Sequence, residues 1–170
     1  MKKLAITACA AVLGAGVAFA SSLSVPWFVD NAPAGNKVPG INQGVTGIVT
    51  LKNNTPDTMT LQISYYAADG TYLGPNAPGN TFSIVGNSSA AFRPNKVDPG
   101  TSVGGQEGAQ GVLIPDRPNT DGKDNGAISV QWVGDPTDVQ GIVTYFQTVK
   151  DPLRGNYATV SYGHQLPEGF

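Results

Sequence analysis

The segment from Thr58 to Tyr66 alternates between polar and apolar residues without a break. Successive side chains of a β-strand point to opposite faces, so this pattern predicts a strand with one buried face. The apolar residues expected to face the core are Met59, Leu61, Ile63 and Tyr65, and those expected to face water are Thr58, Thr60, Gln62 and Ser64. A chain with such a segment needs a second layer to cover the apolar face.

Other alternating or β-branched segments predict further strands, about eight in all. They lie at 23–29, 45–52, 81–85, 88–93, 128–132, 139–149 and 156–162. The segment 139–149 is apolar on both faces, which favours a central position in a sheet. The chain of 170 residues also contains 22 Gly and 13 Pro. These residues disfavour helix interiors, so the sequence predicts an all-β sandwich or barrel.

Three loops interrupt the expected strands. The longest is 94–126, which is rich in Gly and Pro and has apolar weight only at 111–114, where we expect a short strand. The other two are 30–43 and 74–79, each with two prolines. Loops on a rigid scaffold commonly carry binding residues, so the sequence predicts an interaction surface there.

The first twenty residues are typical of a secretory signal peptide. Lys2 and Lys3 precede a run of small and apolar residues, and Ala18-Phe19-Ala20 matches a signal-peptidase site. We therefore expect cleavage after Ala20, a single domain over 21–170, and a location in the periplasm, outside the cell or at its surface. Cys9 is the chain's one cysteine. Its removal would leave no disulfide, which suits a bacterial exported domain with a sufficient core.

Part of the chain resembles bacterial extracellular immunoglobulin-like modules. The residues that carry the resemblance are Gly47–Thr55, Met59–Tyr66, Asp69-Gly70, Phe82–Ile84 and Ser88–Phe92. It implies an immunoglobulin-like antiparallel β-sandwich with long Gly/Pro-rich loops. The chain departs from such modules in its long loop and in having no disulfide between strands. Such modules serve in adhesion, carbohydrate binding, spacing and filaments, so the resemblance implies a fold and not a function.

The sequence offers no convincing set of catalytic residues. His164 is the single histidine, it follows the last expected strand, and no G-x-S-x-G motif occurs. Glu107 and Glu168 are the two glutamates, and most aspartates stand beside turn-forming residues. Structural zinc sites usually need four cysteine or histidine ligands, and the chain without its predicted signal peptide has one histidine and no cysteine. We therefore expect a protein that is not an enzyme.

Calcium is the one cofactor that the sequence leaves open. Calcium takes oxygen ligands, and Asp116, Asn119, Asp121 and Asp124 bring several together in one polar segment. The spacing does not complete a twelve-residue calcium loop, and an ordinary polar turn explains the same residues.

Aromatic residues give a second set of candidate binding residues. Neighbouring aromatics in a strand point to opposite faces, so one of each pair is expected to be exposed. We single out Phe28, Tyr66 and Tyr72, which could stack on sugar rings or pack on another protein. Arg93 and Arg117, each followed by proline, are candidate anchors for a carboxylate ligand, although a solvated surface position is the default explanation of such arginines.

These observations favour a secreted, non-enzymatic β-sandwich with a structural or interaction role at the cell envelope or surface. Low charge and exposed strand edges favour protein partners or self-association. The alternatives are a carbohydrate- or calcium-binding module, with glycan as the partner, and a small outer-membrane β-barrel. The net charge of −2 argues against nucleic acid as a partner, and no span outside the N-terminus suits a transmembrane helix.

Overall fold

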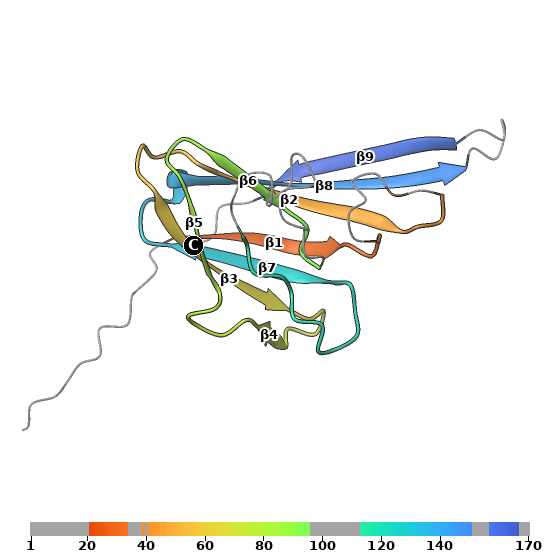
Figure 1. The fold of residues 1–170 in the computed structure, drawn as a ribbon, viewed down its shortest axis with the longest axis horizontal. Coiled ribbons are helices and arrows are strands. Elements are labelled where there is room, and N and C mark those ends of the chain that lie inside the picture. Colours follow the sequence, from red (N-terminus) through yellow and green to blue (C-terminus); the bar gives the residue numbers. More distant parts are fainter. Residues whose placement is uncertain (1–20, 34–38, 40, 96–112, 151–156, 167–170) are drawn as a thin grey trace, which may run out of the picture.

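The computed structural model describes residues 21–33, 39, 41–95, 113–150 and 157–166, which form two antiparallel β-sheets (Figure 1). One sheet contains β1 (Ser21–Val29), β3 (Met59–Tyr66), β4 (Tyr72–Gly74), β5 (Thr81–Ile84) and β7 (Asn125–Trp132). The other contains β2 (Val45–Asn53), β6 (Ser89–Phe92), β8 (Val139–Lys150) and β9 (Tyr157–Gln165). A short 3-10 turn, Pro136–Asp138, precedes β8. The predicted all-β class is confirmed.

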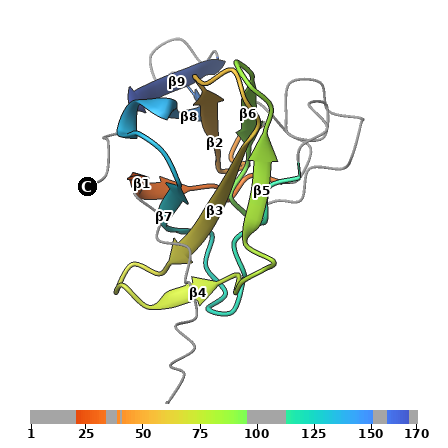
Figure 2. The same cartoon turned by 90° about the vertical axis from the view of Figure 1, so that its left-hand side faces the viewer.

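Each sheet has one edge strand on each side of the molecule. The five-stranded sheet runs β1-β7-β3-β4, with β5 also paired to β3, and the four-stranded sheet runs β6-β2-β8-β9. Figure 2 shows β1 and β9 together on one side, with β5 and β6 on the other. The position of β8 between β2 and β9 confirms the central strand expected at 139–149.

A single hydrophobic core lies between the two sheets, an arrangement consistent with a β-sandwich. Trp132 is its largest fully buried side chain, and its indole N–H donates to the Asp135 carbonyl at 3.0 Å. The core residues predicted from the alternation of β3 are all buried, namely Met59, Leu61, Ile63 and Tyr65. No helix of the described ranges has the length and apolarity that crossing a membrane requires.

The first strand corrects the expectation that Phe28 is exposed. The pairing of β1 with β7 shifts register between Val25 and Phe28. A bulge of this kind reverses the alternation beyond it. Phe28 is therefore fully buried, with its ring edge-on to Tyr65 at 6.3 Å, whereas Trp27, which the alternation directs inward, is 47% exposed. Phe28 supports the core and is not available to a ligand.

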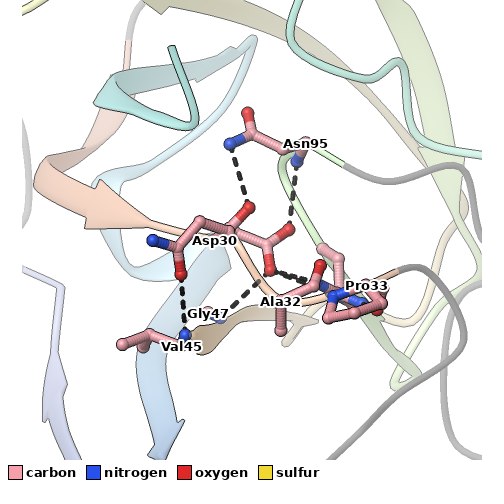
Figure 3. A network of polar contacts seen from close by, with 8 residues as sticks. Asp30, Ala32, Pro33, Val45, Gly47 and Asn95 are labelled. Carbon is pink, nitrogen blue, oxygen red and sulfur yellow. Dashed lines mark hydrogen bonds and ion pairs between the residues drawn. The ribbon is translucent and has the colours of Figure 1, made fainter. Parts of the chain in front are cut away.

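Asp30 and Arg93 form a buried ion pair at one end of the sandwich (Figure 3). Arg93 Nε donates to Asp30 Oδ1 at 2.9 Å, and its other nitrogens donate to the carbonyls of Ala32 and Pro33, each at 2.8 Å. The backbone and side-chain amides of Asn95 donate to Asp30 as well. Burial raises the pKa of Asp30, while Arg93 opposes that rise. Arg93 thus binds a carboxylate of its own chain and is not a surface anchor.

Two expectations about loops and strand ends are wrong in part. Leu113 and Ile114, the described part of the strand expected at 111–114, are not in a strand, although Ile114 is buried in the core. The last strand extends to Gln165, so His164 lies within β9 and not beyond it. The predicted signal peptide with Cys9, most of the 94–126 loop with Glu107, and Glu168 lie outside the described residues.

Candidate functional site

The paired strands β8 and β9 extend beyond the rest of the sandwich. β8 pairs with β2 as far as Gln147, but it pairs with β9 as far as Lys150. Figure 1 shows the ends of these two strands projecting past β1 and β7. The last residues of β8 therefore have only β9 as a strand neighbour.

β9 is exposed on both faces. Every side chain described in it, from Ala158 to Gln165, is exposed, and only the following Leu166 is buried. Tyr162 is 60% exposed and Val160 is 47% exposed, although neighbouring strands bury residues of these types. His164 and Tyr162 of β9 pair with Val143 and Tyr145 of β8, both of which are buried. The even-numbered residues of β9 therefore lie on the core-facing side of the four-stranded sheet. The five-stranded sheet leaves that face uncovered under β9.

A pair of tyrosines connects β9 to the buried part of the molecule. Tyr162 stacks on Tyr145 of β8, with ring centroids 4.9 Å apart and an angle of 28° between the ring planes. The Tyr145 hydroxyl donates to the Trp27 carbonyl at 2.7 Å. Burial, with a smaller effect of Tyr162, raises the pKa of Tyr145 to about 12. Tyr145 therefore stays neutral and supports the exposed ring of Tyr162 from below.

The hydrogen bonds fix which backbone groups of β9 are free. The Leu166 N–H donates to the Gly141 carbonyl at 2.9 Å. Antiparallel ladders alternate between bonded and non-bonded pairs, so the even-numbered residues of β9 direct their backbone groups toward β8. On the other side of β8, the Asn54 N–H donates to the Asp138 carbonyl at 2.8 Å. Even-numbered residues of β8 thus bond toward β2, and odd-numbered residues bond toward β9. The odd-numbered residues of β9 consequently point their N–H and C=O groups outward, a set that we call the free edge of β9: Tyr157, Thr159, Ser161, Gly163 and Gln165.

The composition of β9 contains none of the residues that commonly prevent an edge strand from pairing with another chain. Its sequence, YATVSYGHQ, contains no Lys, Arg, Asp, Glu or Pro. Natural edge strands commonly use such residues, or shortness, to prevent pairing with another chain. The described part of β9 therefore lacks the charged residues, proline and shortness that commonly block strand addition.

Two of the predicted aromatic residues do lie together, on the other sheet. The rings of Tyr66 in β3 and Tyr72 in β4 are 5.6 Å apart with an angle of 59° between their planes. Tyr72 is 44% exposed, and its hydroxyl donates to the Pro75 carbonyl at 2.6 Å. The structure brings these two residues into one surface patch, from which Phe28 is excluded because it lies in the core.

The acidic segment contains an ion pair between Arg117 and Asp121. Arg117 is buried and donates to both carboxylate oxygens of Asp121, at 2.8 and 2.7 Å. This bond lowers the pKa of Asp121. Within the described ranges, no group of three or more His, Cys, Asp or Glu residues is placed to hold a metal ion. Arg117 is therefore a partner of Asp121 and not a free anchor, and the calcium site at Asp116, Asn119, Asp121 and Asp124 stays a prediction.

A shallow hollow of about 270 Å³ lies on the outer face of the four-stranded sheet. Lys52, Gln140, Ile142 and Gln165 are among its lining residues, none of which is a carboxylate or a histidine. Thr50 and Ser89 also line the hollow, so it offers hydroxyl, amide and ammonium groups for hydrogen bonds.

Sequence reasoning missed the free edge of β9. It placed binding in the loops, because nothing in a single sequence tells which strand ends a sheet. The signal that pointed to it was the absence of charge between Tyr157 and Gln165. This signal acquires meaning only when the sheet order makes β9 an edge.

Comparisons with known proteins place the chain in no family. No family model matches it. No curated protein matches it either. A solved structure from Thermotoga maritima, described as "Crystal Structure of Thermotoga maritima 1070", has a TM-score of 0.44 and 13% sequence identity to this chain. The match covers 86% of this chain and 94% of the Thermotoga chain. A likeness at that TM-score carries no argument about function.

Proposed function

We propose that this chain is a secreted, non-enzymatic protein of the cell envelope or surface that acts through protein–protein association at the free edge of β9. The predicted signal peptide at residues 1–20 supports export. The observation that carries the association is an uncharged edge strand of nine residues whose described side chains are all exposed. Such an edge offers an extended backbone to a partner strand.

The immunoglobulin-like character of the sandwich belongs to the same proposal. Its support is the resemblance over 47–93 together with two antiparallel sheets around one core. Modules of that kind often serve as spacers or adhesive units, which agrees with a role in association.

Site-specific photo-cross-linking in cells that produce the full chain tests this function. A photoreactive residue replaces Ser161 on the β9 edge or, as the matched control, the exposed Ser89 on the β6 edge of the same sheet. We expect adducts from position 161 in the envelope or extracellular fraction and none from position 89. Equal labelling of both positions, no adduct at 161, or a chain that stays in the cytoplasm would contradict the proposal.

The tyrosine patch supports carbohydrate binding as a second candidate function. Tyr66 and Tyr72 present a tilted pair of rings on a sheet surface, and exposed aromatic rings can stack on sugars. Glycan-array binding by the full chain, lost in Tyr72→Ala and kept in Tyr162→Ala, would support it. Absence of binding to any glycan would exclude it.

A further inference from the structure

The free edge of β9 matches itself about one central residue. Its outward-pointing residues are spaced symmetrically around Ser161, with Thr159 and Gly163 on either side and Tyr157 and Gln165 at the ends. Two antiparallel copies of β9, related by a two-fold axis through Ser161, would pair each of these residues with another of the same set. All outward N–H and C=O groups would then have partners, as a bonded antiparallel ladder requires.

The side chains agree with the same register. Val160 would lie opposite Tyr162 of the second copy, and pairs of an aromatic with a β-branched residue stabilise sheets. Ala158 would lie opposite His164 of the second copy. No residue of β9 carries a carboxylate, an ammonium or a guanidinium, so no like charges meet across the axis. A shift by one residue would set outward backbone groups against inward ones and lose this match.

The surroundings of β9 leave space for a second copy. No described part of the chain covers either face of the strand, because its described side chains are exposed on both. Lys150, the charged residue nearest in the ladder, pairs with Tyr157 at the end of the strand and lies away from the axis. The net charge of −2 for the whole chain adds little repulsion between copies.

We infer that two copies of this chain join their four-stranded sheets through antiparallel β9–β9 pairing about a two-fold axis at Ser161. The inference rests on the proposed function and names the partner as a second copy. The pairing is isologous and closes on itself, so it gives a dimer and leaves the other surfaces free for further contacts.

Disulfide cross-linking tests the register. In a Cys9→Ser background, Ser161→Cys places two thiols at the axis, in a bonded pair whose Cα atoms lie about 5.5 Å apart. That distance is within disulfide reach. Thr159→Cys is the matched control, because it lies opposite Gly163 and the two copies of Thr159 would be about 13 Å apart along the strand. Ser89→Cys on β6 controls for random collision.

We expect a covalent dimer from Ser161→Cys under mild oxidation, and none from Thr159→Cys or Ser89→Cys. Circular dichroism melts that match the parent chain show that the variants fold. A covalent dimer from Thr159→Cys and not from Ser161→Cys would overturn the register, and three monomeric variants would overturn the dimer.

The outcomes separate this inference from the proposed function. If Ser161→Cys stays monomeric while the photoreactive residue at 161 still captures a different protein, the edge binds another partner. The inference then fails and the proposed function stands. If neither position 161 experiment gives a product, both fail.

Discussion

The four-stranded sheet has two edges, and the chain treats them differently. β6 spans four residues, of which three are buried, and it leads directly into the buried Arg93. β9 spans nine residues, and all its described side chains are exposed. Both strands are edges of the same sheet, but β6 contributes Ala90 and Phe92 to the core and β9 contributes no residue described in it.

The comparison indicates that β6 is protected and β9 is not. Shortness and burial leave β6 little free backbone, which is how natural sheets commonly avoid pairing with other chains. β9 has neither of these features, and it lacks charge and proline as well. The sheet thus has a long unprotected edge at β9 and a protected edge on its opposite side at β6, which agrees with the association proposed at β9.

The largest expected effect on the free energy of unfolding comes from removing the buried Asp30–Arg93 ion pair next to β6. Arg93→Met would leave Asp30 buried without its counter-ion and remove the bonds to Ala32 and Pro33. We expect a loss of about 3–5 kcal/mol in the free energy of unfolding, measured by urea denaturation.

Lys150→Met is the matched control for Arg93→Met, because it removes an exposed cation at the end of β8. Its effect should stay within about 0.5 kcal/mol. Equal stability of the two variants would mean that the buried Asp30–Arg93 pair does not stabilise the fold next to β6.

Two valines allow a comparison between the part of β8 that packs on the core and the part that projects beyond the sandwich with β9. Val143 is fully buried, whereas Val149, on the same sheet face, is 36% exposed. Val143→Ala should lower the free energy of unfolding by about 2 kcal/mol through lost burial and a new cavity. Val149→Ala should change it by less than about 0.5 kcal/mol in thermal or urea unfolding at matched protein concentration. Similar losses at both positions would show that the projecting part is covered in solution.

The smallest effect concerns the Arg117–Asp121 pair, in which the arginine is buried and the carboxylate is partly exposed, and it depends on pH. Arg117 lowers the pKa of Asp121 in the folded chain. Stability from this pair is therefore complete above the unfolded pKa, close to pH 4, and is lost as pH falls through the depressed folded pKa. Asp121→Asn should destabilise the chain slightly at pH 7, and the difference from the parent should disappear in melting curves recorded at strongly acidic pH. A difference that persists in strong acid would assign the effect to packing.

The all-β class and the core residues of β3 could be predicted from the sequence. Polar and apolar residues alternate strictly there, and in a strand this puts every second side chain, such as Met59 and Ile63, in the core. The prediction failed at Phe28, because a bulge in β1 reverses the alternation and depends on pairing with a distant strand. It placed Arg93 and Arg117 at the surface, because it did not recognise their carboxylate partners: Asp30 lies far from Arg93 in the sequence, and Asp121 lies four residues after Arg117. Of the aromatic candidates, Tyr72 is exposed and Tyr66 is partly exposed, and the contact between their rings was not predicted.

Amide hydrogen exchange along β9, followed by NMR at increasing protein concentration, tests the central claim most directly. The amides of Val160, Tyr162 and His164 face β8 and should be protected at every concentration. Those of Thr159, Ser161 and Gly163 should exchange freely in dilute solution and become protected as the protein associates. Odd-numbered amides that exchange freely at all concentrations, in a sample shown to be associated, would contradict pairing at the free edge of β9.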